Sequence, residues 1–421
     1  MQYKKHNIDG IDIHIIKTNK FKSIYISTVL INKFKKENLT NNFVLRKLLT
    51  TSSKKLKNEI EVTRKVSELY NSGIVISNDV VNETITTNFD MEVLEDKYTE
   101  DGLLENALNY YFDTILYPNI INDEFEKENF DLAIKTATTY YESEKENKNK
   151  YAVDNAFLLI DDEFLKYNRN GYMDDLKNIT RKSIATYYKE LLDKANVSIF
   201  LIGNINEEKV LNIIRNNING KFKNNNNYFK NITFTEKTKS IEKEDIEKNN
   251  QSILVMIYKI LNLTDRERNV VLPVFNRIFG VGTNSKLFKN VREKNSLCYD
   301  IRSTVSRSSI MTIQSGIDFK NKEKCIELIN QELTNMKNGN ISDEEFNEAI
   351  NFRRKSLKQF EDYNDSILYI KESNILFNND DLDDRNKQLD TIKKEEIIEL
   401  SKKIYLNITY LLKGDNENGQ D

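Results

Sequence analysis

The second half of this 421-residue sequence repeats the order of predicted elements in the first half, and this duplication constrains the fold most. Three pairs of segments correspond, at offsets that drift over roughly 210–225 residues. They are 72–77 (SGIVIS) with 296–301 (SLCYDI), 121–125 (INDEF) with 341–346 (ISDEEF), and 180–204 with 391–415. A period this long exceeds that of solenoid repeats, so it predicts two homologous domains.

Hydrophobic periodicity predicts both strands and helices in each half. The strands of the first half are expected within 8–34, 74–88 and 197–202. The helices are expected over 42–50, 59–71, 103–116 and 123–146, with Thr180 as the N-cap of a further helix. We therefore predict an α+β fold in which each domain is a mixed or antiparallel sheet packed with helices on one face. The predicted domains are 1–222 and 241–421, joined by an Asn-, Lys- and Glu-rich linker at 223–240.

The composition excludes several classes of protein. The 63 basic and 66 acidic residues give a net charge of −3 and are interspersed, which argues against nucleic acid as a partner. No run of about 18 apolar residues occurs, so no membrane span is expected. The two cysteines, Cys298 and Cys325, form no disulfide framework, and the N-terminal residues lack an apolar leader segment. We expect a cytoplasmic protein.

Residues 279–300 (FGVGTNSKLFKNVREKNSLCYD) carry the most distinctive local pattern. The stretch opens with a Gly280-x-Gly282 turn, and Asn284 and Ser285 follow as candidate helix caps. A G-x-G turn alone is a weak signal for phosphate binding, because the third glycine and the βαβ context are missing.

A short helix after this turn brings two polar side chains toward one junction. The helix carries Leu287, Phe288 and Val291, with Arg292 at its C-terminal end. The strand that follows is predicted to place Leu297, Tyr299 and Ile301 on one face. Arg292 and Tyr299 are therefore expected to converge where the helix meets the strand.

The order of glycine turn, Asn-Ser, Leu-Phe, Val-Arg-Glu-Lys, Leu and Tyr in 279–300 resembles the second-domain signature of insulinase/pitrilysin-type zinc peptidases. The subunits of mitochondrial processing peptidase belong to the same family. The domain pattern around the signature covers nearly the whole chain. The resemblance implies two peptidase-like domains of similar topology.

The resemblance also implies that the zinc site is absent here. Catalytic members carry H-x-x-E-H on a first-domain helix, where two histidines bind zinc and the glutamate activates water. In the matching helix, Asn42, Leu45 and Arg46 stand at these three positions. The chain holds only His6 and His14, which would lie about 27 Å apart in one extended strand and are interpreted as ordinary strand residues. We expect no cofactor in this chain, and a local ion pair for Arg46.

Two further segments resemble a bacterial branch of the family that lacks the zinc motif, the YmfF-like proteins. They are Leu69-Tyr70-Asn71, after the second helix, and Lys148-x-x-Tyr151-Ala152, after the long helix. In the two-component peptidases that this resembles, a partner chain holds zinc and the zinc-free chain supplies an Arg–Tyr pair.

Arg292 and Tyr299 match that pair. Both can donate hydrogen bonds to a peptide carbonyl oxygen on which charge develops. The alternative is structural: Arg292 interacts with the helix C-terminus and Tyr299 fills a half-buried strand. Cys298 is interpreted as an inert buried thiol, since no histidine is available to activate it.

The resemblance therefore implies a chain that is not catalytic on its own. We expect the substrate-binding subunit of a heterodimeric zinc metallopeptidase, with peptide substrate and an H-x-x-E-H-bearing paralogue that holds the zinc. The alternatives are a structural core protein and a stand-alone peptide-binding module or self-associating clamp. Retention of both Arg292 and Tyr299 favours the first function.

Overall fold

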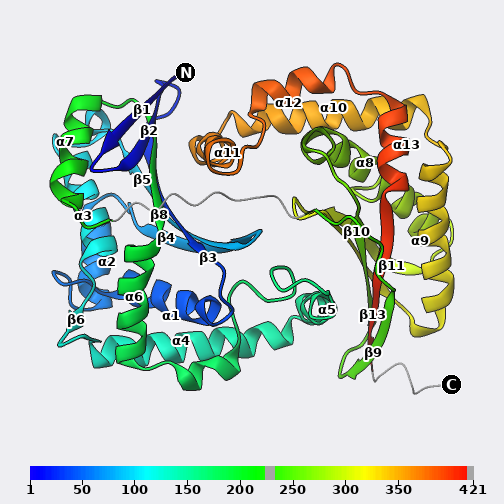
Figure 1. The fold of residues 1–421 in the computed structure, drawn as a ribbon, viewed down its shortest axis with the longest axis horizontal. Helices are drawn as coiled ribbons and strands as arrows, with labels where there is room; N and C mark the ends of the chain where they lie inside the picture. The colour runs from blue at the N-terminus through cyan, green and yellow to red at the C-terminus, as the bar shows by residue number, and fades with distance from the viewer. Residues whose placement is uncertain (223–232, 415–421) are drawn as a thin grey trace. The chain divides into compact units, whose positions relative to one another are not determined.

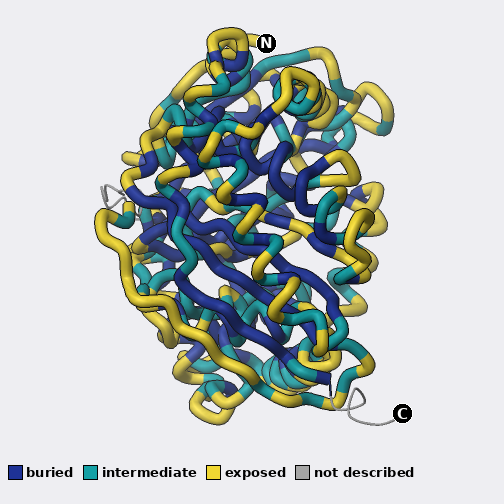
Figure 2. Tube along the Cα trace, turned by 90° about the vertical axis from the view of Figure 1, so that its right-hand side faces the viewer, coloured by how far each residue is buried: buried dark blue, intermediate teal, exposed yellow. Residues whose placement is uncertain are grey.

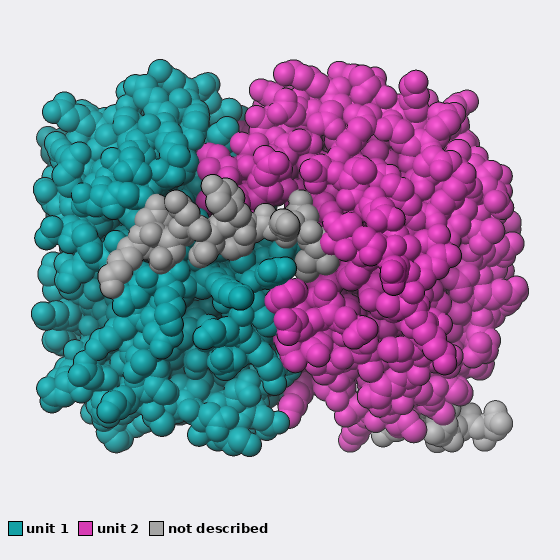
Figure 3. Space-filling view, in the orientation of Figure 1, with its two compact units in different colours: residues 1–143, 168–229, 363–372 teal, residues 144–167, 230–362, 373–421 magenta. Residues whose placement is uncertain are grey.

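A computed structural model of the protein describes residues 1–222 and 233–414. These residues form two compact units (Figure 3). Unit 1 comprises 1–143, 168–229 and 363–372, and unit 2 comprises 144–167, 230–362 and 373–421. Residues 223–232, which include most of the predicted linker, lie outside the described residues. The contiguous division into 1–222, 223–240 and 241–421 stays a prediction. In the structure, residues 144–167 of the N-terminal half belong to unit 2, and residues 363–372 of the C-terminal half belong to unit 1.

Unit 1 is built on a six-stranded sheet (Figure 1). Its strands, in spatial order, are β1 (Gln2–Ile8), β2 (Ile11–Lys17), β8 (Asn196–Gly203), β3 (Ser23–Lys33), β5 (Thr84–Leu94) and β4 (Ile74–Val81). Strands β2 and β8 are parallel, and every other neighbouring pair is antiparallel.

Helices pack against one face of this sheet through a single apolar core. The helices of the N-terminal half are α1 (Glu37–Thr51), α2 (Glu59–Glu68), α3 (Leu103–Leu116), α4 (Lys127–Glu146), α6 (Arg181–Lys194) and α7 (Glu207–Ile218). Alternate strand residues such as Ile11, Ile13 and Ile15 lie in this core with Tyr111 and Leu108 of α3. The side chains that fill this core recur with the period of two that the alternating sequence pattern predicts, although His14 and Ile16 on the other face are also buried.

Unit 2 repeats the arrangement with five strands. In spatial order they are β11 (Cys298–Val305), β12 (Ile310–Ile317), β10 (Ser252–Ile260), β13 (Ile404–Gly414) and β9 (Ile241–Glu247). Only the pair β13–β9 is parallel, as β8–β2 is in unit 1. The equivalent strands thus occupy equivalent places, and the predicted α+β duplication is confirmed. The long buried stretches of strand are dark blue in Figure 2.

The helices of unit 2 lie mainly on one face of its sheet. They are α8 (Leu272–Phe279), α9 (Lys322–Lys337), α10 (Asp343–Phe360), α12 (Leu382–Leu389) and α13 (Lys394–Lys402). Helix α5 (Lys148–Phe157) packs on the other face, where Ala152 and Ala156 meet Val255 and Ile257 of β10. Thr391, which corresponds to Thr180 in the repeat, does not cap a helix: its hydroxyl donates to the carbonyl of Gln388, and α13 begins three residues later. No helix formed by the described residues is long and apolar enough to cross a bilayer.

The first residues of α11 (Asn364–Phe377) belong to unit 1. The Asn364 side-chain amide donates to Ser23 Oγ at 3.1 Å and to Glu92 Oε1 at 2.8 Å. These contacts tie the start of the helix to strands β3 and β5.

Further along α11, the buried carboxyl group of Glu372 lies near the half-buried carboxyl group of Asp90. Glu372 is 6% exposed, and the Asp90 carboxyl and the Ser27 hydroxyl lie beside it. Burial, followed by the charge of Asp90, raises the pKa of Glu372 to about 8. Burial also raises the pKa of Asp90 to about 6, and Asp365 adds to this rise. The contact between α11 and the sheet is therefore most stable when these carboxyl groups are protonated.

This pair of carboxyl groups predicts a loss of stability as pH rises. A carboxyl group with a raised folded-state pKa keeps a proton that the unfolded chain has already released, so stability falls between about pH 4.5 and pH 8. Glu372→Gln removes that proton linkage and should raise the free energy of unfolding at pH 8 by roughly 2 kcal/mol, with a smaller gain at pH 5. Urea denaturation followed by far-UV circular dichroism measures this. Glu83→Gln, at an exposed carboxyl, is the matched control, and equal pH profiles for all three proteins would contradict the prediction.

Candidate functional site

The glycine turn of 279–300 holds the site segment against strand β11. Gly280 ends α8, donates to the carbonyl of Asn276 at 2.9 Å, and accepts from the Ser303 N–H at 3.0 Å. A Cβ atom at residue 280 would lie 2.3 Å from Ser303 Oγ and 2.9 Å from a methyl carbon of Leu287. The close approach therefore requires glycine here.

The segment after the turn is a short helix of π type. The Ser285 hydroxyl accepts from the Phe288 N–H at 3.4 Å, so Ser285 caps the turn as predicted. The π-helical turn Phe288–Glu293 then carries Arg292, whose guanidinium lies 4.6 Å from the centre of the Phe288 ring. Val291 is fully buried beneath it and anchors the turn in the core.

A bulge at the start of β11 changes which residues share a face. Cys298 pairs with Ile317 and Asp300 with Gly316, so Tyr299 is an extra residue in the strand. Tyr299 is 60% exposed, whereas Ile301 is 6% exposed. The prediction that these two residues share one face is therefore wrong, because an unbroken alternation was assumed.

Arg292 and Tyr299 line one open cavity of about 550 Å³, within unit 2. The Tyr299 hydroxyl donates to Asp318 Oδ1 at 3.0 Å, and Asp318 lies in the same lining. Sequence reasoning missed Asp318. The signal was the hairpin register, since the pairing of Cys298 with Ile317 brings the next residue beside the Tyr299 segment.

Cys298, one of the two cysteines of unit 2, also lines this cavity. Cys298 and Cys325 are both buried and free, in line with the prediction that they form no disulfide framework. Burial raises the pKa of the Cys325 thiol to about 12 and raises that of Cys298 as well. Neither thiol is therefore activated as a nucleophile.

The degenerate zinc-motif positions lie on α1 in unit 1 and serve as packing. Asn42 is 1% exposed, and its Oδ1 accepts from the Tyr187 hydroxyl at 2.7 Å. Leu45 is part of the apolar core. A neutral amide, an aliphatic side chain and, at Arg46, a permanent cation do not fit a zinc ion. Among residues 1–222 and 233–414, no group of three or more His, Cys, Asp or Glu side chains is placed to bind a metal.

Arg46 differs from its predicted role. Its Nη2 donates to Asn170 Oδ1 at 3.0 Å, and its guanidinium lies 4.9 Å from the centre of the Phe43 ring. The predicted ion pair is wrong for the described residues: the partners are a neutral amide and an aromatic ring. Burial lowers the pKa of Arg46, and the charge of Arg169 lowers it further.

The two histidines lie in a hairpin instead of one extended strand. A turn at Asp9 and Gly10, both with positive φ, joins β1 to β2, so His6 pairs with Ile13 in the neighbouring strand. His14 is buried against the Phe200 ring at 4.5 Å, and burial lowers the pKa of His14 to about 4. His14 is thus a neutral core residue.

The fold and these sites together define a class of protein. The chain has two duplicated α+β units with a signature segment in the second, and its first unit carries a helix in which Asn and Arg hold the two zinc-ligand positions and Leu holds the position of the glutamate. That is the architecture of an insulinase-type peptidase chain without zinc ligands.

Comparisons with known proteins agree with this class. Residues 178–352 match the family model described as the Peptidase M16 inactive domain. The chain is 25% identical over 426 residues to the probable inactive metalloprotease YmfF of Bacillus subtilis, covering 96% of each. A conserved protein from Enterococcus faecalis superposes with a TM-score of 0.92 at 26% identity, covering 99% of this chain and 100% of that one. A peptidase M16 inactive domain from Pseudomonas fluorescens, 14% identical, shares the fold with a TM-score of 0.79 over 98% of each chain.

These similarities, together with Asn42, Leu45 and Arg46 at the motif positions, are those of a chain that resembles the YmfF-like branch of the insulinase/pitrilysin-type (M16) peptidases, which lacks the H-x-x-E-H motif.

The close approach at Gly280 predicts a specific sensitivity. Gly280→Ala should lower the free energy of unfolding by roughly 1–3 kcal/mol, because the new methyl group overlaps Ser303 and Leu287. Gly73→Ala is the matched control, since a Cβ there makes an ordinary 3.6 Å contact with Val66. Chemical denaturation of both variants measures the difference. Equal stabilities would mean that β11 moves freely away from residue 280.

Proposed function

We propose that this chain is the substrate-binding subunit of a heterodimeric zinc peptidase, and that its partner is a paralogue bearing H-x-x-E-H. The observation that carries the proposal is the single cavity lined by both Arg292 and Tyr299. The partner would hold the zinc and supply the metal chemistry, whereas this chain would contribute hydrogen-bond donors to a peptide substrate. We also propose a cytoplasmic location, because both cysteines are free and buried.

The chemistry of the pair suits a substrate carbonyl group. A guanidinium and a phenol hydroxyl can both donate to an oxygen that gains negative charge during attack on a peptide bond. Asp318 accepts the Tyr299 hydroxyl in the free chain, so substrate binding would exchange this acceptor for a carbonyl oxygen. Asp318 would therefore be a positioning residue.

A scaffold role is the second candidate. Its support is that both side chains already have partners within the chain: the Phe288 ring for Arg292 and the Asp318 carboxylate for Tyr299. A stand-alone peptide-binding module is the third candidate. The three candidate functions differ in whether adding a partner chain produces peptidase activity.

Reconstitution tests the partnership directly. The isolated chain should hold far less than one equivalent of zinc and cleave no peptide, because Asn42, Leu45 and Arg46 replace the motif. Mixing it with an H-x-x-E-H-bearing paralogue from the same genome should give a complex with peptidase activity that neither chain shows alone. Metal analysis, gel filtration and peptide cleavage measure these outcomes. Full activity of the paralogue by itself would contradict the substrate-binding role of this chain and would favour the scaffold role.

Two substitutions separate catalytic support from packing. Arg292→Ala and Tyr299→Phe should each lower kcat of the assembled pair by about a hundredfold, since one lost transition-state donor costs roughly 3 kcal/mol. If the pair only holds the substrate backbone, KM rises and kcat stays unchanged. The double variant should lose less than the sum of the two effects, because both donors act on one charge.

Assembly of each variant must be shown by gel filtration before its kinetics are interpreted. Lys289→Ala, on the exposed side of the same helical turn, is a control that should leave both constants unchanged. Wild-type kinetics in an assembled Arg292→Ala and an assembled Tyr299→Phe pair would remove both residues from the site.

A further inference from the structure

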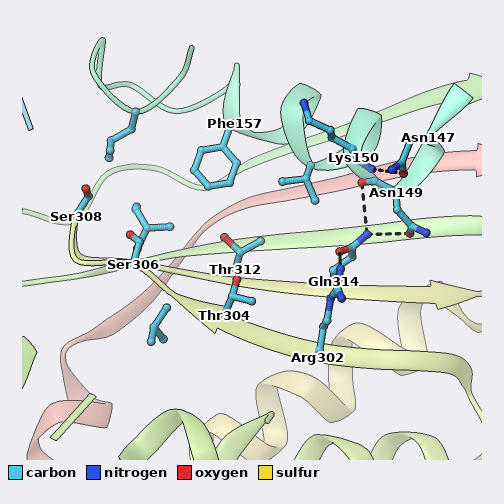
Figure 4. Close-up of a pocket in the computed structure, with 14 residues that line it drawn as sticks. Asn147, Asn149, Lys150, Phe157, Arg302, Thr304, Ser306, Ser308, Thr312 and Gln314 are labelled. Atoms are coloured by element: carbon cyan, nitrogen blue, oxygen red, sulfur yellow. Dashed lines mark hydrogen bonds between the residues drawn. The ribbon is translucent and has the colours of Figure 1, made fainter. Parts of the chain in front are cut away.

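A second cavity in unit 2, of about 480 Å³, lies between α5 and the hairpin β11–β12 (Figure 4). Its lining holds two basic side chains, Lys150 and Arg302, and no acidic one. The remaining lining is neutral, part hydroxyl and amide groups and part apolar side chains. A hollow with this lining favours an anionic ligand.

Arg302 supplies the uncompensated charge. Its Nη2 donates to Gln314 Oε1 at 2.9 Å, and no carboxylate among the described residues lies within ion-pair distance of it. Asp300, two residues earlier on the same strand, accepts from the Gly316 N–H at 3.1 Å instead. The guanidinium is exposed and has further N–H donors available to a ligand.

Lys150 is paired with two carboxylates, Glu144 at 3.1 Å and Asp154 at 2.7 Å, which together outweigh its single positive charge. It therefore adds little positive charge to the cavity.

Gln314 orients Arg302 without neutralising it. Gln314 is 6% exposed, and its Nε2 donates to Asn149 Oδ1 at 2.8 Å (Figure 4). Because the Gln314 amide nitrogen donates to Asn149, its oxygen Oε1 points toward Arg302. The opposite orientation of the amide would place its N–H donors against the N–H donors of the guanidinium. An amide acceptor holds the arginine in place and leaves its full charge for a ligand. Asn149 at the start of α5 thereby links the helix to the hairpin.

The rest of the lining selects among anions. Thr304 and Thr312 place hydroxyl groups beside Arg302, and Phe157 and Leu165 form an apolar wall. A bare phosphate would leave this wall unused, and no glycine-rich backbone cradle for phosphate is present in the lining. A peptide carboxylate beside an apolar side chain uses both parts, and the planar guanidinium matches a carboxylate with two parallel hydrogen bonds.

We propose that this cavity is a subsite for a peptide carboxylate, in which Arg302 binds the anion and Gln314 positions Arg302. The subsite is separate from the cavity of Arg292 and Tyr299. It requires no partner chain, so binding by the isolated full-length protein tests it whether or not the peptidase partnership exists.

The test uses fluorescent octapeptide pools that differ at one position. Both pools are acetylated and amidated, with small and apolar residues elsewhere, and carry a central Glu or a central Gln. A third pool carries the central Gln and a free C-terminus. Fluorescence anisotropy should show binding of at least one carboxylate-bearing pool about tenfold tighter than the neutral pool, with weakening at higher salt. The pool that binds tells whether a side chain or a terminus supplies the carboxylate.

Arg302→Gln should abolish this preference while leaving the weak binding of the neutral pool unchanged. Gln314→Met should weaken the preference only in part. Its effect should be smaller than that of Arg302→Gln, because the positioning residue is lost while the arginine that binds the anion remains. Arg64→Gln, at an exposed arginine of α2, removes the same charge outside the cavity and should bind like the wild type. Thermal unfolding of each variant checks that the fold is retained.

The proposal would be overturned by no preference for either carboxylate pool, by the same preference in folded Arg302→Gln, or by an equal loss in Arg64→Gln. Displacement of the peptides by millimolar inorganic phosphate as effectively as by free glutamate would also overturn it, because the cavity would then be a general anion site.

Discussion

Strand β10 is the element on which the rest of unit 2 depends. All nine of its residues are buried, and it pairs with β12 on one side and β13 on the other. Such a strand has both faces covered, so its register is strongly specified by side-chain burial. Through β12, that register places Tyr299 and Arg302 of β11. Helix α5 packs on the other face of the same strand, which fixes Asn149 near Gln314.

The sequence contained most of the fold, because the fold depends on local periodicity and on duplication. Helix α3 has the predicted bounds of 103–116, and the two sheets share one strand order. Contacts between distant segments could not be read in the same way. Neither the membership of 363–372 in unit 1 nor the packing of α5 on the sheet of unit 2 leaves a local signal.

The same distinction applies to the candidate site. The convergence of Arg292 and Tyr299 follows from a short helix and the strand after it, and both line one cavity. The role of Asp318 depends on hairpin register, and the neutral partner of Arg46 comes from residue 170, far along the chain. Arg46 has no acidic neighbour in the sequence, yet it was expected to form an ion pair. Ring stacking and an amide acceptor satisfied it instead, because both keep a half-buried guanidinium hydrogen-bonded.

The helix that carries zinc ligands in catalytic relatives shows how a metal site can be replaced by ordinary packing. A histidine pair in such a site depends on the metal to hold its ring nitrogens. In this chain, Asn42 is held by the Tyr187 hydroxyl and Leu45 lies in the core, so the helix is stabilised with no ion. Restoring histidines would therefore have to break a buried hydrogen bond and leave the Tyr187 hydroxyl without its acceptor, which costs roughly 1–3 kcal/mol.

The bulge in β11 lets one strand serve both cavities. In an unbroken strand, residues three apart point to opposite faces, so Tyr299 and Arg302 could not both be exposed. The extra residue between Cys298 and Asp300 changes this parity. Cys298 and Ile301 can then both face the core while Tyr299 and Arg302 both face outward. A single inserted residue thus preserves the apolar packing and presents two hydrogen-bond donors of different chemistry on one edge of the sheet, where each lines its own cavity.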